Sequence, residues 1–83
     1  MSAYCLGGHT ASGEPVHDGA VAWGDAPMGS RWRIVEGPAA LIGQEFTVLD
    51  VSARRFRHRM DRWVASCAEA FAFGIPFVVV EPA

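Results

Sequence analysis

The sequence contains no lysine, so all seven of its positive charges are arginines. Nine acidic residues outnumber them, which gives a formal net charge of −2 and a pI near 5.8. A dedicated nucleic-acid binder usually carries a positive balance, so the composition argues against that class of protein. Charge of either sign is scarce: 19% of the residues are charged and 51% are hydrophobic, which indicates a folded globule and not a disordered chain.

Long apolar runs are also missing. The longest, "IPFVVV" at 75–80, is the length of a strand, whereas a membrane-spanning helix needs about 20 apolar residues. We therefore predict no membrane span. The opening "MSAYC" leads straight into turn-rich sequence, without a basic segment followed by an apolar one, so no secretory signal peptide is predicted.

Cysteine is limited to Cys5 and Cys67, which lie far apart in the sequence. No CxxC or HxxxH spacing accompanies them or the three histidines, so we predict no metal and no other cofactor. Two interpretations of the cysteines remain open. The preferred one is two small buried hydrophobic side chains, and the other is a disulfide that joins the two ends of the domain.

The length of 83 residues predicts one domain, residues 1–83. Nine glycines and five prolines spread along the chain predict short strands and frequent turns. In "RWRIV", Trp32 and Ile34 alternate with arginines, as in a half-buried strand. The predicted strands are two short ones within 2–23, around a Gly/Ser-rich loop, and then 31–35, 44–51, 58–64 and 76–80.

One short helix is predicted before the last strand. Ser66 is placed as its N-cap, with Glu69 three residues later as in a capping box, and Gly74 ends it. The apolar residues 76–80 are predicted to form a strand that is buried on both faces. Six short strands with one short helix predict a mainly β fold that closes into a small barrel.

The order of several motifs resembles the three-aspartate (3D) domain. These are "AYC", "TASGEPV", "VAW", "PMGSRW", two aspartates eleven positions apart, and a short helix that ends in "AFG". The resemblance covers roughly residues 3–80. It implies a six-stranded double-psi β-barrel of the kind found in lytic transglycosylases, in related peptidoglycan-cleaving proteins of spore-forming bacteria and in phage-encoded proteins.

The resemblance also implies which residues form the site. Asp61, in "RMD", corresponds to the catalytic acid/base, and Asp50 corresponds to the second aspartate of the family. Asp25 stands one residue after the position of the first aspartate and is predicted to bind substrate. The segment "DVSA" at 50–53 replaces the "DTGG" of the family.

An acidic side chain suits the implied reaction, because cleavage of a glycosidic bond requires an acid that protonates the leaving oxygen. Trp63 shares a predicted strand face with Asp61, and an aromatic neighbour desolvates a carboxyl group and raises its pKa. A hairpin between Asp50 and Asp61 would bring their carboxylates to within about 5–8 Å. Trp63 is also a predicted substrate-binding residue.

The sequence leaves the role of the arginine-rich segment 54–62 open. It is predicted to form the solvated tip of that hairpin, with binding of an anionic wall polymer, through Arg59 above all, or of a partner protein as alternatives. Thr10 and Ser12, in "TASG", either bind substrate or hold their own turn by hydrogen bonds.

Two functions follow. The first is a lytic transglycosylase-like enzyme that cleaves the β-1,4 bond between MurNAc and GlcNAc in peptidoglycan strands. The second is a non-catalytic barrel module, such as a phage virion or tail component, or an accessory that binds glycan or other phage or cell-wall proteins; "DVSA" is the feature that favours it. We expect a place in the cell wall or periplasm if the chain is delivered there or belongs to a longer protein, or in a virion, and otherwise in the cytoplasm.

Overall fold

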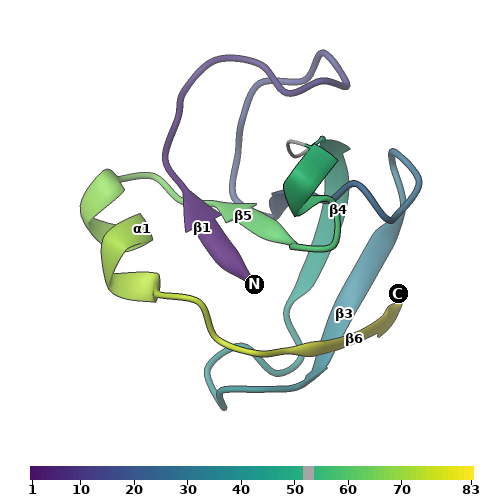
Figure 1. Ribbon diagram of the computed structural model, residues 1–83, viewed down its shortest axis with the longest axis vertical. Coiled ribbons are helices and arrows are strands. Elements are labelled where there is room, and N and C mark those ends of the chain that lie inside the picture. The colour runs from purple at the N-terminus through teal and green to yellow at the C-terminus, as the bar shows by residue number, and fades with distance from the viewer. Residues whose placement is uncertain (52–53) are drawn as a thin grey trace.

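The structure is a computed structural model that describes residues 1–51 and 54–83. Its strands form one mixed sheet, and one α-helix stands beside it (Figure 1). The prediction of a mainly β fold is therefore confirmed. The elements in chain order are β1 (Ser2–Tyr4), β2 (Ala20–Ala22), β3 (Arg31–Glu36), β4 (Glu45–Asp50), the 3-10 turn η1 (Arg54–Phe56), β5 (Asp61–Trp63), α1 (Cys67–Phe73) and β6 (Val79–Pro82).

The six strands lie in the order β1-β5-β2-β4-β3-β6. No pairing joins the two outer strands among the described residues, so the closed barrel expected from the sequence does not form. The chain from α1 to β6 passes β1 without strand pairing, and there the Met1 amino group donates a hydrogen bond to the Pro76 carbonyl at 2.8 Å. Proline has no backbone N–H, so residue 76 cannot extend a ladder at this point.

The hairpin predicted between Asp50 and Asp61 is wrong, because β2 lies between β4 and β5. β2 pairs with β4 in parallel and with β5 antiparallel, and Ala22 is the partner of Asp50 on one side and of Asp61 on the other. The three small residues of β2 are all buried and take the centre of the sheet. The two aspartates therefore lie on either side of Ala22, with Cα atoms about 10 Å apart by the usual strand spacing.

The core is formed by apolar residues that the strands and the β3–β4 loop turn inward. In β3 the predicted alternation is confirmed: Ile34 is buried and Trp32 is partly buried, whereas Arg31 and Val35 face solvent. Trp23 and Trp32 meet edge to face, with ring centroids 5.0 Å apart, and both pack against the core. The buried cluster consists of Met1, Val21, Ile34, Leu41, Phe46, Val48 and Met60.

The predicted helix is confirmed at both ends. Ser66 is the N-cap, and its hydroxyl accepts a hydrogen bond from the Glu69 amide at 3.2 Å; Gly74, with φ of 67°, ends the helix. Cys67, its first residue, forms a disulfide with Cys5, which follows β1 directly. This bond replaces the preferred interpretation of two free cysteines and ties α1 to β1. Within the described part of the chain, no helix has the length and apolar character needed to cross a membrane.

The last strand is not buried on both faces as predicted. β6 contains residues 79–82 and pairs only with β3, so one of its edges is open. Phe77, just before it, is 85% exposed, and Val79 is also exposed.

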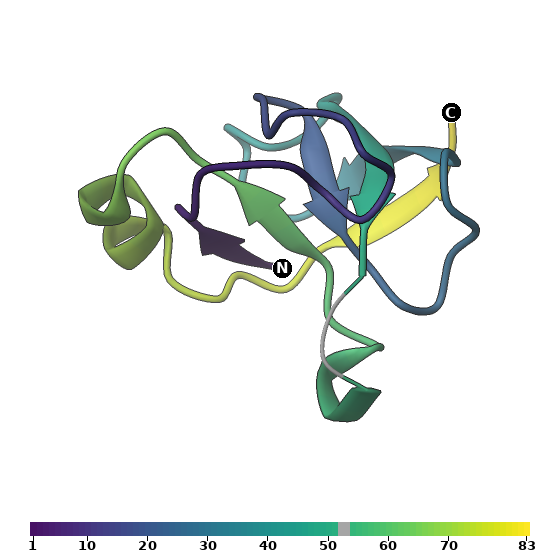
Figure 2. The ribbon, with the colours of Figure 1, turned by 90° about the horizontal axis from the view of Figure 1, so that it is seen from above.

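The segment from Arg54 to Arg59 projects from the sheet, as Figure 2 shows. The segment packs closely against Gly24, and a side chain at position 24 would collide with it. A Cβ atom on Gly24 would lie 2.6 Å from the Arg57 Cβ and 3.0 Å from its Cα. The backbone N–H of Asp25 donates to the Arg57 carbonyl at 3.1 Å, so this approach is part of the fold.

Gly24→Ala is expected to lower the free energy of unfolding by about 1–3 kcal/mol, because the added methyl group meets backbone that cannot rotate away. Gly7→Ala is the matched control, since a Cβ there meets nothing within 4 Å. Urea unfolding of both variants measures the difference. Equal midpoints would show that the segment does not rest on Gly24.

Candidate functional site

A hollow of about 500 Å³ lies over the point where Ala22 separates the two aspartates. Its volume is in the range of small-molecule sites. Four strands, β1, β2, β4 and β5, contribute to it together with the projecting segment, and both of the aspartates predicted to be catalytic line it. The lining residues are Ser2, Ala3, Tyr4, Leu6, Ala22, Asp50, Val51, Phe56, Arg59 and Asp61.

Asp61 is half-buried at the start of β5. The Ser2 hydroxyl donates a hydrogen bond to its Oδ1 at 2.9 Å. Desolvation raises the pKa of Asp61 above its usual range; the bond from Ser2 and the positive charges of Arg59 and the amino terminus oppose the rise without cancelling it. A carboxyl group in this setting keeps its proton to a higher pH than an exposed aspartate does, as a general acid must.

Trp63 does not line the hollow that contains Asp61. It lines a different hollow beside α1, and its indole N–H donates to the Leu6 carbonyl at 3.1 Å. The predicted substrate contact of Trp63 therefore lies away from the two aspartates. The neighbour of Asp61 in the sheet is Ser2 of β1, which is its register partner in the parallel β1–β5 ladder.

Asp50 is held by backbone amides. Its Oδ1 accepts hydrogen bonds from the N–H groups of Ala11 at 3.0 Å and Val51 at 2.9 Å. Among the described residues its Oδ2 has no hydrogen-bond donor. One oxygen therefore fixes the "TASG" loop to β4, and the other is available to a ligand in the hollow.

Thr10 and Ser12 serve the loop and do not line the hollow. Thr10 is buried, with its Oγ1 2.7 Å from the Ser12 Oγ, and it donates to the Glu14 carbonyl at 3.1 Å. The Ser12 amide donates to the Leu49 carbonyl at 3.0 Å. Of the two roles left open by the sequence, the geometry favours hydrogen bonding within the turn.

Asp25 also lies outside the hollow. Its carboxylate contacts the His58 imidazole through a short hydrogen bond and the Arg57 guanidinium at 4.0 Å. These contacts hold the projecting segment beside Gly24. Asp25, predicted from the sequence to bind substrate, therefore anchors this segment and does not line the hollow that contains Asp50 and Asp61.

Tyr4 lines the hollow with the two aspartates, a position that was not predicted from the sequence. Its hydroxyl is buried and has no hydrogen-bond partner among the described residues. Burial, with the nearby charges of Asp50 and Asp61, raises the pKa of Tyr4 to about 12, so the hydroxyl remains a donor throughout the physiological range. Ser2 and Tyr4 stand two residues apart, and this spacing on one strand face is the signal that points to them together.

Arg59 lines the hollow as expected for a substrate contact, and its guanidinium stacks on Phe56, 5.3 Å from the ring centroid. The arginine-rich segment is not one continuous surface. Arg62 lies elsewhere, 14% exposed, stacked on Phe46 and Phe73 and bonded to the Asp18 carboxylate at 3.3 Å. Residues 52 and 53 of "DVSA" lie outside the described residues.

Within the described ranges, no cluster of three or more histidine, cysteine, aspartate or glutamate side chains is arranged to hold a metal ion. Comparisons of this chain with protein-family models, with curated proteins and with solved structures found no match. The function is accordingly argued from the residues of the hollow.

Tyr4→Phe is expected to leave the free energy of unfolding unchanged or to raise it by about 1 kcal/mol, since it removes a buried donor that has no partner. The same change should weaken any ligand that accepts a hydrogen bond from this hydroxyl. Thermal unfolding and ligand titration of the variant measure the two effects. A clear loss of stability would show that the hydroxyl already has a partner in the folded chain.

Proposed function

We propose that the chain cleaves the β-1,4 bond between MurNAc and GlcNAc in peptidoglycan strands as a lytic transglycosylase, with Asp61 as acid and base. The observation that carries the proposal is the setting of Asp61. It is a half-buried carboxyl with a raised pKa, in a hollow of sugar size, and Asp50 faces the same hollow across Ala22.

In the proposed reaction, protonated Asp61 gives its proton to the glycosidic oxygen as the bond from C1 to that oxygen breaks. The 6-hydroxyl of the same sugar then attacks C1 and loses its proton to Asp61, which closes a 1,6-anhydro ring. The proton balance is restored, and neither water nor a metal enters the sequence. Asp50 stabilises the positive charge that develops at C1.

Two other groups support substrate binding in this proposal. The Tyr4 hydroxyl, which has no partner among the described residues, donates to a sugar oxygen, since Tyr4 lines the same hollow as the two carboxylates and its hydroxyl remains protonated. The Arg59 guanidinium, at the edge of the hollow, attracts the carboxylates of the wall polymer.

The proposed fold relationship is the double-psi barrel of the three-aspartate domain. The strand order supports it. In two places, strands that follow one another in the sequence run in opposite directions and have a third strand between them in the sheet. β1 and β2 enclose β5, and β4 and β5 enclose β2. The two arrangements are interleaved, and the site lies where they meet, at Ala22.

The proposed place of action is the cell wall or periplasm, reached by delivery or as part of a longer protein, or a phage virion. The Cys5–Cys67 disulfide supports an oxidising compartment, because structural disulfides persist outside the reducing cytoplasm.

A second candidate function is a module that binds glycan or a partner protein without cleaving. One observation favours it: the Oδ1 of Asp50 is already bonded to two backbone amides, which is a structural use of that carboxylate. In this case the hollow would hold a sugar and release it unchanged.

Incubation with insoluble cell wall distinguishes the two functions. After sedimentation, the enzyme is expected to leave anhydro-muropeptides in the soluble fraction, which mass spectrometry detects. A binding module would sediment with the wall and release nothing. Protein that neither sediments nor releases sugar would exclude cleavage and glycan binding, and would leave binding of a partner protein as the second function.

A further inference from the structure

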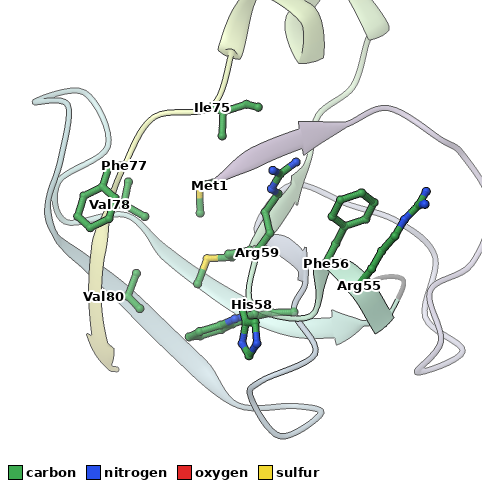
Figure 3. A pocket seen from close by; sticks show the side chains of 11 residues that line it. Met1, Arg55, Phe56, His58, Arg59, Ile75, Phe77, Val78 and Val80 are labelled. Atoms are coloured by element: carbon green, nitrogen blue, oxygen red, sulfur yellow. The ribbon is translucent and has the colours of Figure 1, made fainter.

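A second hollow, of about 410 Å³, adjoins the first (Figure 3). It lies between the projecting segment 54–59 and the chain that leads from α1 into β6. Phe56 and Arg59 line both hollows, so these two side chains form a shared wall. In Figure 3, Phe77 and Val78 stand on the opposite side from Phe56, with Met1 between them.

The second hollow is lined by two arginines that form no salt bridge among the described residues. The side chains of all arginines except Arg54 are described. Among them, only Arg55 and Arg59 have no carboxylate within 4.0 Å, and both line this hollow. They stack on the Phe56 ring, at 4.8 Å and 5.3 Å from its centroid. The ion pairs of the others are Arg31–Glu45, Arg33–Glu81, Arg57–Asp25 and Arg62–Asp18.

No aspartate or glutamate lines the second hollow among the described residues, whereas two carboxylates line the first. Of the other basic groups here, His58 already faces Asp25, and the Met1 amino group already donates to the Pro76 carbonyl. The two hollows therefore differ in charge although they share a wall: the first suits neutral sugar hydroxyls, and the second suits an anion.

The rest of the second hollow is apolar. Phe77 is 85% exposed and Ile75 is 66% exposed, although both belong to residue types that are usually buried. They stand over buried Met1 and Met60. A ligand that fits both features carries a carboxylate close to small apolar side chains.

We propose that the second hollow binds a short peptide with a free carboxylate and small apolar side chains. Arg55 and Arg59 would bind the carboxylate, and Ile75 and Phe77 would cover the side chains. Because the proposal rests on the function above, the peptide is the arm carried by the glycan strand. A sugar in the first hollow then places its peptide across Phe56 into the second.

Trp23 provides an internal reporter, because it lines the second hollow and its buried indole N–H has no partner among the described residues. The other two indoles are already bonded: Trp32 donates to the Ser30 hydroxyl at 2.9 Å, and Trp63 donates to the Leu6 carbonyl at 3.1 Å. A ligand in this hollow should move the indole resonance of Trp23 and leave that of Trp63 unchanged.

The test is a titration of the ¹⁵N-labelled protein with N-acetyl-D-alanyl-D-alanine and, separately, with its C-terminal amide. The free acid is expected to shift the Trp23 resonance saturably, and the amide to bind at least about 10-fold more weakly. Arg55→Gln should weaken binding of the acid by about 5- to 10-fold. Arg31→Gln, which removes the same charge elsewhere, should not. Equal affinity for the acid and the amide would overturn the proposal. So would an equal loss of affinity for the acid in Arg55→Gln and Arg31→Gln.

Failure of this inference is distinguishable from failure of the proposed function. Asp61→Asn should abolish cleavage and still bind the peptide. The unchanged protein should prefer wall that carries peptide arms, and Arg55→Gln should reduce this preference. Peptide binding without any cleavage by the unchanged protein contradicts the proposed function alone. Cleavage without preference for peptide-bearing wall contradicts the assignment of the second hollow.

Discussion

Removal of the Cys5–Cys67 disulfide is expected to lower the free energy of unfolding by about 4 kcal/mol. The bond joins residues 62 positions apart, and the chain-entropy treatment of such a cross-link gives a value of this size. The loss is large for a domain whose total stability is expected near the lower end of the usual range of about 5–15 kcal/mol.

The site should respond to this change as well as the fold. Cys5 directly follows β1, a three-residue edge strand that supplies Ser2 and Tyr4 to the hollow. If the bond is lost, β1 keeps its pairing with β5, its packing against α1 and the hydrogen bond from the Ser2 hydroxyl to Asp61. We therefore expect the double variant Cys5→Ala/Cys67→Ala to bind ligand less well even where it remains folded.

Urea unfolding of the oxidised protein and of the double variant measures the stability change. Reductant is the internal control, because it should lower the midpoint of the unchanged protein and have no effect on the variant. A difference below about 1 kcal/mol would show that β1 and α1 hold together without the bond.

Asp61→Asn is expected to lower the rate of glycan cleavage by about 100- to 10,000-fold, the range associated with loss of a general acid and base. Asparagine keeps the shape of the side chain and can still accept the hydrogen bond from Ser2, so glycan binding should persist. Asp18→Asn is the matched control. Asp18 lies on the exposed surface, where its contact is with Arg62. Equal rates for the two variants would remove Asp61 from the mechanism.

The pH dependence follows from the direction of the Asp61 pKa shift. Cleavage requires the protonated acid, so the rate should fall as pH rises through a pKa above the 3.8 of an ordinary aspartate. The contribution of Asp61 to the free energy of unfolding should also fall as pH rises through this pKa. Ionisation is less favourable in the folded chain, so the stabilising contribution of protonated Asp61 is present below 3.8 and is lost as pH rises through the raised pKa. Above that pKa, Asp61→Asn should be at least as stable as the unchanged protein.

Local sequence patterns predicted the local structure well. The Ser66 cap, the Gly74 end and the alternation around Ile34 each depend on a few neighbouring residues, and each is confirmed. The failures concern pairing between distant segments. Nothing in "LDVSARRFRHRMDRW" reveals that β2 separates its two ends, because the partner of a strand is determined by the whole sheet.

The site was only partly predicted, because pairing between distant strands also determines which side chains meet in it. Asp50, Asp61 and Arg59 meet in one hollow as expected, although through Ala22 and not through a hairpin. Asp25 and Trp63 were assigned to it by sequence position and lie outside it. Ser2 and Tyr4 enter it from β1, which pairs in parallel with the distant β5. Their two-residue spacing places them on one strand face, but it does not reveal which strand lies beside them.

The most direct test of the proposed function is digestion of purified cell wall in ¹⁸O-labelled water, followed by mass spectrometry of the soluble sugars. Attack by the 6-hydroxyl of the sugar predicts anhydro-muropeptides that contain no label from the solvent. Soluble fragments that carry ¹⁸O at a reducing end would show that water is the nucleophile. Wall that remains intact would contradict the assignment of Asp61 as a catalytic acid.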